Sequence, residues 1–134
     1  EQLRKARYRV WLMKEAPLQP FHPPYRLSRL AMLHKPTADV GFPLAEHLKQ
    51  KAFINRLFAQ IAATDAGITV LDPTPALCDA SGLCRAQRDG HSLYTDDNHL
   101  SEAGARLMLP VLAPVFEEAS AQALTGVSEV NTAR

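Results

Sequence analysis

Two side chains in the segment 94–101 have the chemistry of an acid and base pair. Asp96 and His99 stand three residues apart, shortly before Ser101, which is a good N-cap for a helix. In a tight turn the carboxylate can reach the near ring nitrogen of the imidazole and fix its tautomer, so that the far nitrogen can take a proton. The spacing therefore predicts a general base. No serine of the chain stands in a convincing nucleophile context, so we expect the chain to carry part of an active site.

Other interpretations of the same residues stay open. An Asp-x-x-His sequence often occurs by chance, and near a helix start it can simply cap the helix and stabilise a turn. Imidazoles and carboxylates can also bind zinc or manganese. Four such residues lie close together: His91, Asp96, Asp97 and His99. The pair follows a strand-like Leu93-Tyr94, which would bring it to the end of an α/β sheet, where ligand sites tend to gather.

The composition is that of one globular domain, with 46% hydrophobic and 22% charged residues among 134. The net charge of +1 gives no overall field that favours nucleic acid or an anionic membrane. No apolar run approaches the roughly 20 residues that span a bilayer, and the N-terminus does not have the pattern of a signal peptide. Because the chain starts at Glu1 rather than Met, we expect a piece of a longer protein.

Apolar spacing predicts a strand, a helix and a second strand in that order. Residues 8–13 are a short aromatic and β-branched run, and residues 68–71 are predicted to form a second short strand after Gly67. Between them, apolar side chains recur at helical spacing: Ile54, Leu57, Phe58 and Ile61. This order predicts a parallel, right-handed crossover. A last helix is expected to begin at Ser101 and to be kinked or divided by Pro110 and Pro114.

The segment 17–43 contains six prolines, which predict a loop without long regular elements over most of its length, with room for one or two helical turns over 25–34. A loop this long is more often a functional lip than a spacer. Phe21, Tyr25 and Arg26 are weak candidates for substrate binding, with anchoring of the loop as the favoured alternative. Trp11 is expected in the core. Three histidines are expected to face solvent: His22, His34 and His47.

The two cysteines, Cys78 and Cys84, flank a five-residue segment that could close a disulfide loop. Two unpaired thiols in a reducing compartment are an equal alternative at this point. Zinc is disfavoured because no second Cys or His pair stands at suitable spacing.

Several motifs in one order resemble the end of an SGNH hydrolase domain. They are Cys78-x5-Cys84, Asp89-Gly90, Leu93-Tyr94, Asp96-x-x-His99-Leu100-Ser101 and Gly104-Ala105. More narrowly, the chain is similar to extracytoplasmic SGNH domains fused to acyltransferase-family-three membrane proteins, which O-acetylate cell-surface polysaccharides. The resemblance covers most of residues 7–118 and is strongest over 78–105. It implies an α/β, three-layer flavodoxin-like fold with a parallel sheet, present as its C-terminal portion in residues 1–120, with a flexible tail over 121–134.

The resemblance also implies roles for individual residues. Asp96 and His99 would be the acid and base of a triad in the chain order Ser, Asp, His, and this explains them better than a metal site does. Cys78 and Cys84 would form a disulfide. The Gly-Asp-Ser block of the nucleophile and the Gly and Asn blocks of the oxyanion hole are missing, so we expect them upstream of Glu1.

The function implied is part of a serine-dependent O-acyltransferase or esterase of cell-surface polysaccharide, inactive as this chain alone. The partners would be an acyl donor delivered by a membrane acyltransferase domain and a carbohydrate acceptor, with no cofactor, metal or nucleic acid. The expected location is the periplasmic or extracellular face, tethered to the inner membrane through upstream segments. The alternative is a non-catalytic carbohydrate-binding or interaction domain with a degenerate SGNH fold.

Overall fold

The computed structural model describes residues 8–117 and 119. Its centre is a pair of parallel strands, β1 (Val10–Met13) and β3 (Ile68–Leu71), in register from Val10 opposite Ile68 to Met13 opposite Leu71. The β-branched and aromatic side chains of both segments favour this extended conformation. Helix α4 (Ala52–Thr64) lies between them in the sequence and packs on β3. The predicted order of strand, helix and strand is therefore confirmed, as is the parallel pairing.

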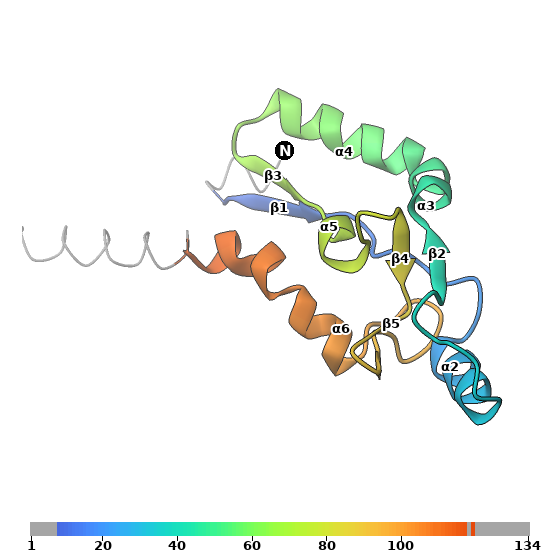
Figure 1. The fold of residues 1–134 in the computed structure, drawn as a ribbon. Coiled ribbons are helices and arrows are strands. Elements are labelled where there is room, and N and C mark those ends of the chain that lie inside the picture. The colour runs from blue at the N-terminus through green and yellow to red at the C-terminus, as the bar shows by residue number, and fades with distance from the viewer. Residues whose placement is uncertain (1–7, 118, 120–134) are drawn as a thin grey trace, which may run out of the picture.

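Helices flank the parallel pair on two sides. In Figure 1, α4 lies above the strands and α6 (Glu102–Leu107) lies below them. Val70 of β3 and Leu107 of α6 line the same cavity, which has a volume of about 620 Å³. The chain thus has a mixed α/β architecture built on a small parallel sheet. Within residues 8–117 and 119, no helix combines the length and apolar character that crossing a membrane would require.

Two antiparallel pairs lie beside this unit and lead toward the C-terminal helices. Strand β2 (Gly41–Pro43) pairs with β4 (Leu83–Arg85), and β5 (Gln87–Arg88) forms a hairpin with β6 (His91–Ser92). The hairpin turn is Asp89-Gly90, with φ angles of 52° and 79°. Both central residues of a type I′ turn need positive φ, which Asp-Gly supplies at low cost. This turn sets the direction in which the chain enters residues 93–101.

The segment 17–43 is more regular than the sequence predicts. It contains α2 (Pro23–Met32), a helix of ten residues. Pro23 and Pro24 occupy its first two positions, where a backbone N–H has no partner within the helix and the fixed φ of proline suits the helical backbone. His22 caps the helix, because its Nδ1 accepts a hydrogen bond from the backbone N–H of Tyr25 at 3.4 Å. The predicted helical turns over 25–34 are present, but the helix is longer and begins two residues earlier, because Pro23 and Pro24 start it.

The C-terminal helices follow the prediction. Ser101 is the N-cap of α6, and its Oγ accepts a hydrogen bond from the backbone N–H of Gly104 at 3.2 Å. Helix α6 ends at Leu107, and a second helical segment, 109–117, begins one residue before Pro110. The division ahead of Pro110 was expected. The predicted tail, 121–134, lies outside the described residues.

A compact apolar cluster supports the segment that carries Asp96 and His99. Its members are at most 6% exposed: Leu77 of α5 (Thr74–Leu77), Leu93, Tyr94 and Met108. Gly104 brings α6 very close to the backbone of this segment, since an added Cβ would lie only 2.1 Å from the carbonyl oxygen of Leu93. The fold thus needs a residue without a side chain at this crossing.

Leu93 and Tyr94 are buried, but they are not a strand of the parallel sheet. Tyr94 forms an isolated antiparallel bridge with Leu100, so the two sides of the following turn pair with each other. The strand-like interpretation of Leu93-Tyr94 was therefore wrong, because Tyr94 pairs locally with Leu100 and not with a strand of the sheet.

His47 is only 2% exposed, and its expected position in solvent was wrong. It belongs to α3 (Leu44–Gln50), which ends before α4 begins at Ala52. Because α3 and α4 are separate helices, the polar face of α4 does not extend to His47 and does not predict its exposure. Burial lowers the pKa of the imidazole, and the nearby charge of Lys51 lowers it further.

Candidate active site

Asp96 and His99 lie in a short turn, residues 95–99, that we call the Asp–His turn. It is closed at its base by a hydrogen bond from the backbone N–H of Thr95 to the carbonyl of His99, at 2.8 Å. Beyond it, the backbone N–H of Ser101 donates to the carbonyl of Leu93 at 3.0 Å. The turn therefore leads directly into the N-cap of α6, which fixes its exit direction.

Within the turn, one carboxylate orders both the backbone and the imidazole. Oδ1 of Asp96 accepts hydrogen bonds from the backbone N–H groups of Asn98 and His99, at 2.9 and 2.7 Å. Oδ2 of Asp96 lies 2.8 Å from Nδ1 of His99. The predicted contact between the carboxylate and the near ring nitrogen is therefore present in the structure. The imidazole remains 73% exposed, and among the described residues none forms a hydrogen bond or ion pair with its Nε2.

These contacts determine which ring nitrogen carries the proton. The backbone N–H of Asn98, then the backbone and side chain of His99, hold the pKa of Asp96 at about 2, below its ordinary value of 3.8. At neutral pH the carboxylate is ionised and can only accept hydrogen bonds. Nδ1 of a neutral His99 must then be the protonated nitrogen. Nε2 is left with a free lone pair and is available to take a proton.

Two contacts from the segment 17–19 anchor the Asp–His turn to the body of the protein. The buried hydroxyl of Tyr94 donates to the carbonyl of Pro17 at 2.8 Å, and burial raises the pKa of this phenol. The backbone N–H of Gln19 donates to the carbonyl of Asp97 at 2.8 Å. The side chain of Gln19, 3% exposed, also donates to the carbonyl of Cys84 at 3.2 Å. Gln19 therefore ties the turn to strand β4.

Cys78 and Cys84 form a disulfide, as the resemblance implies. The loop that it closes is also held by Asp79, whose carboxylate contacts Ser81 and Arg85. These hydrogen bonds, with that of Ser81 the largest, keep the pKa of Asp79 at about 2. The disulfide, Asp79 and Gln19 together fix the position of β4 relative to the Asp–His turn.

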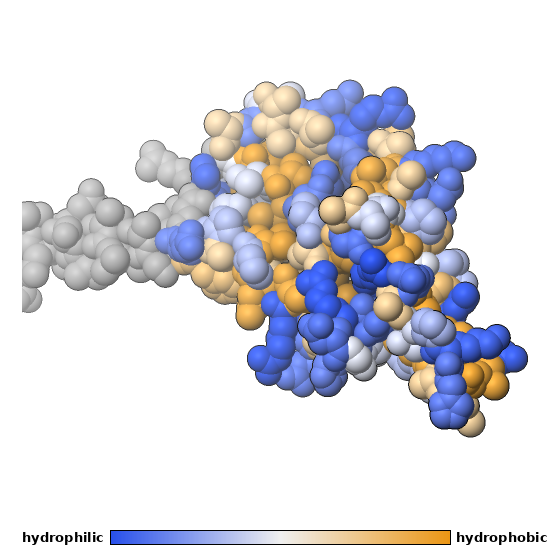
Figure 2. All heavy atoms as spheres, viewed as in Figure 1, coloured by the Kyte–Doolittle hydropathy of each residue, from blue (hydrophilic) through white to orange (hydrophobic). Residues whose placement is uncertain are grey.

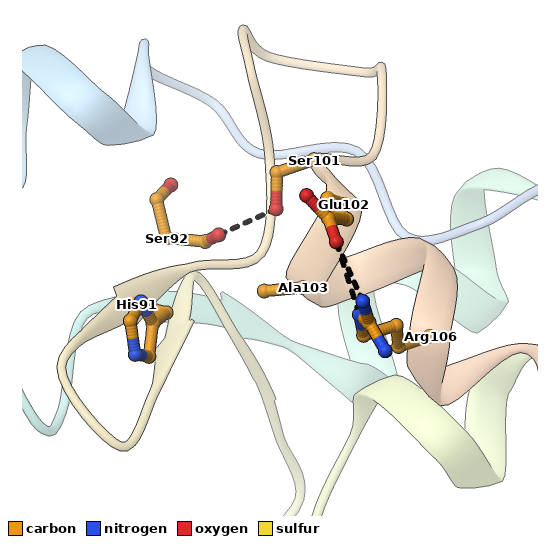
Figure 3. Close-up of a pocket in the computed structure, with 6 residues that line it drawn as sticks. All are labelled: His91, Ser92, Ser101, Glu102, Ala103 and Arg106. Carbon is orange, nitrogen blue, oxygen red and sulfur yellow. Dashed lines mark hydrogen bonds and ion pairs between the residues drawn. The ribbon is translucent and has the colours of Figure 1, made fainter.

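The serines that the structure describes are all engaged in local hydrogen bonds. Figure 3 shows Ser92 and Ser101 in a cavity of about 460 Å³ between β6 and α6. The hydroxyl of Ser101 donates to the carbonyl of Ser92 at 2.6 Å, and that of Ser92 donates to the carbonyl of Tyr94 at 2.7 Å. Ser28 donates to the carbonyl of Pro24, and Ser81 donates to Asp79. Each serine of the described part therefore has a structural role.

The metal interpretation gains no geometric support. Among residues 8–117 and 119, no three His, Cys, Asp or Glu side chains gather in a way that could hold a metal ion. His91 lines the cavity in Figure 3, which has neither Asp96 nor His99 in its wall. The side chain of Asp97 is exposed, and only its backbone carbonyl takes part in the anchoring described above.

The weak substrate-binding candidates lie together at the start of α2. The guanidinium carbon of Arg26 stands 4.4 Å from the centre of the Phe21 ring, and both residues line a cavity of about 400 Å³ with Tyr25. Tyr25 is 67% exposed. Trp11, by contrast, is partly buried in β1 opposite Thr69. The structure thus brings Phe21, Tyr25 and Arg26 into one surface.

Parallel strands between helices, together with an Asp and a His paired in a turn before a helix, are features that α/β serine hydrolases share. Residues 1–114 match a family model described as "SGNH domain (fused to AT3 domains)", and the chain therefore belongs to this SGNH family. The comparisons with curated proteins and with solved structures found no match. Membership indicates an esterase or acyltransferase type of activity in general, and the fusion named in the family description fits a membrane acyltransferase partner.

Sequence reasoning missed the residues that hold the turn in place. Gln19 lies among the prolines of the segment 17–43 and carries no motif, and Tyr94 was recognised only as part of an apolar pair. The apolar Leu93-Tyr94 directly before a polar turn was the available signal for Tyr94. The sequence contained no signal for the role of Gln19, because its hydrogen-bond partners, Cys84 and Asp97, are 65 and 78 residues away.

Proposed function

We propose that the chain supplies the acid and base of a serine-dependent O-acyltransferase or esterase that acts on cell-surface polysaccharide. The observation that carries this proposal is the double use of Asp96, which binds the backbone of the Asp–His turn and the Nδ1 of His99 at 2.8 Å. A base held by its own turn keeps one orientation and one tautomer. This arrangement is what proton transfer from a serine hydroxyl requires.

In the proposed reaction, Nε2 of His99 takes the proton of a serine hydroxyl while the serine oxygen attacks the carbonyl carbon of an acyl donor. His99 then gives this proton to the departing group as the bond to the acyl carbon breaks. In the second half, a sugar hydroxyl or water passes its proton to His99 and attacks the acyl-serine, and His99 returns the proton to the serine oxygen. Asp96 stabilises the imidazolium that forms in each half.

The nucleophile is proposed to lie upstream of Glu1, in a Gly-Asp-Ser block. Support comes from the local hydrogen bonds of the four described serines, which leave none of them placed as a nucleophile. The purified 134-residue chain should then fail to hydrolyse an aryl acetate. Robust hydrolysis that disappears when one of the chain's own serines is replaced by alanine would overturn this part of the proposal.

The family match supports the setting that we propose for the chain. Residues 1–120 would be the C-terminal portion of a three-layer, flavodoxin-like domain on the periplasmic or extracellular face, with β1 and β3 continuing into a larger parallel sheet. Upstream membrane segments would tether the domain, and a membrane acyltransferase domain would deliver the acyl group. The Cys78–Cys84 disulfide supports an oxidising compartment.

A non-catalytic carbohydrate-binding domain is the second candidate, and the same engaged serines favour it. The gene sequence upstream of Glu1 separates the two. A Gly-Asp-Ser block preceded by membrane spans supports the enzyme with a membrane partner, and the block without spans supports a soluble SGNH esterase. A long upstream region without the block supports the binding domain and contradicts the acyltransferase proposal.

A further inference from the structure

Helix α2 extends away from the body of the protein and presents one side to solvent. Figure 1 shows it at the lower right, beyond the strands, and it contacts β6 of the β5–β6 hairpin. In Figure 2 the same region presents hydrophilic and hydrophobic residues side by side. Along it, side chains spaced three or four residues apart form one wall of the cavity of about 400 Å³. We call this surface the α2 groove. It is lined by Phe21, His22, Tyr25, Arg26, Arg29, Leu30, Leu33 and Lys35.

The α2 groove is positively charged and has no acidic side chain of its own. The sequence contains no Asp or Glu between Glu15 and Asp39. Arg26 and Arg29 are exposed, as is Lys35, and none of the three forms an ion pair within residues 8–117 and 119. Three cations without a carboxylate partner form a surface that complements an anion. The net charge of +1 for the whole chain does not reveal this local excess of positive charge.

The groove also offers two aromatic rings. The guanidinium carbon of Arg26 lies 4.4 Å from the centre of the Phe21 ring, a cation–π contact that restrains the position of the guanidinium group. The second ring belongs to Tyr25, which directly precedes Arg26 on α2 and is exposed. Aromatic rings bind the apolar faces of sugar rings, and guanidinium groups bind carboxylates through paired hydrogen bonds.

We propose that the α2 groove binds an anionic glycan, in which sugar rings contact Phe21 and Tyr25 while their carboxylates bind Arg26, Arg29 and Lys35. This rests on the proposed function in one respect: the glycan would be the acceptor. The groove is well placed for that role because Phe21 follows Gln19 by two residues, and Gln19 binds the Asp–His turn. In this proposal a bound chain extends from the groove toward His99.

An anionic lipid surface is the competing occupant, since Met32 and Leu33 at the end of α2 are 81% and 55% exposed. The glycan accounts for more of the surface. The three cations and the two rings line one concave wall, whereas Met32 is not part of it. A flat membrane would contact the end of the helix and leave the Phe21–Arg26 pair unused.

The test uses isothermal titration calorimetry of the protein that includes the upstream gene segment, with an oligogalacturonate and with its methyl-esterified, neutral counterpart. We expect the neutral probe to bind at least about tenfold more weakly. Arg29→Ala should weaken binding of the acidic probe about fivefold to tenfold, and Lys35→Ala about threefold. Arg29 is exposed, so circular dichroism should show an unchanged fold.

The matched control is Arg56→Ala. Arg56 is exposed on α4 beside Phe53, which is 75% exposed, so it reproduces an arginine and an aromatic ring on another helix. We expect its effect on binding to stay within about twofold. Equal binding of the two probes, or equal losses in the Arg29 and Arg56 variants, would overturn the proposal.

Further measurements separate glycan binding by the α2 groove from the proposed catalytic function and from membrane binding. Binding needs neither a nucleophile nor a base, so His99→Ala should bind the acidic probe as well as the unmodified chain does. Absence of binding by a protein that transfers acyl groups would overturn the inference and leave the proposed function intact. Association with phosphatidylglycerol vesicles that requires Arg29, without binding of the oligogalacturonate, would assign the surface to a membrane and also overturn it.

Discussion

Replacing Gly104 with alanine tests how the structure positions the Asp–His turn. Helix α6 crosses the buried backbone at Leu93 so closely that the new Cβ would lie 2.1 Å from the carbonyl oxygen and 3.0 Å from the carbonyl carbon. The oxygen belongs to the backbone and cannot rotate away. The helix and the segment before the turn must therefore separate by roughly 1 Å or more to reach normal contact.

The magnitude follows from two opposing effects. Alanine is the better helix former by about 1 kcal/mol, which would stabilise α6 if the position were open. Overpacking against a backbone atom costs about 1–3 kcal/mol, and this contact belongs at the upper end because nothing flexible can yield. The same carbonyl of Leu93 also accepts the hydrogen bond from Ser101, which would be strained. We expect a net loss of about 2 kcal/mol in the free energy of unfolding.

The assay is urea unfolding followed by the fluorescence of Trp11, the single tryptophan of the chain. Ala105→Gly, on the exposed side of the same helix, is the matched control and should lose about 1 kcal/mol through helix propensity alone. In NMR spectra, Gly104→Ala should also shift the His99 ring signals, whereas Ala105→Gly should leave them in place. The sign is decisive: a Gly104→Ala variant more stable than the original chain would refute the close approach and the positioning that depends on it.

Two more predictions concern the disulfide loop and the Asp–His turn. Joint replacement of Cys78 and Cys84 by alanine should cost about 2 kcal/mol, the loop entropy for a sequence separation of 6, measured by the same unfolding assay. Intact-mass analysis should show a gain of two hydrogens on reduction, and free thiols in periplasmically expressed protein would contradict the bridge. Carboxyl NMR should find the pKa of Asp96 near 2. The ionised carboxylate then stabilises the fold fully at a pH above 3.8, the ordinary pKa of an aspartate, and this stabilisation is lost as the pH falls through about 2. In His99→Ala the pKa should remain well below 3.8, because the backbone N–H groups persist; a return to 3.8 would contradict their leading role.

The sequence was sufficient for features that depend on local chemistry. The aromatic and apolar run at β1, the β-branched run at β3, the apolar spacing of α4 and the Ser101 cap depend on residues close in sequence, and all are present in the structure. The contact between Asp96 and His99 is also local, since it needs only a turn of the right length. Such features can be derived from residue type and spacing because no distant partner decides them.

The remaining features depend on partners or on position within an element. Pro23 and Pro24 look like helix breakers, but at the first two helical positions they favour the helix that follows. His47 is buried because α3 and α4 are separate helices, which the apolar periodicity of α4 does not reveal. The hydrogen bond from Tyr94 to Pro17 joins residues 77 positions apart. No spacing rule predicts a partner at that distance.

The central claim is that Asp96 and His99 act as the acid and base of a serine-dependent acyl transfer. Its most direct test is the rate of aryl acetate hydrolysis by the protein that includes the upstream gene segment, compared between Asp96→Asn and Asp97→Asn. The two substitutions make the same chemical change in adjacent residues of one turn, but only Asp96 contacts the imidazole. We predict that kcat falls about 10⁴-fold in Asp96→Asn and changes less than about twofold in Asp97→Asn. Equal rates in the two variants would contradict the claim.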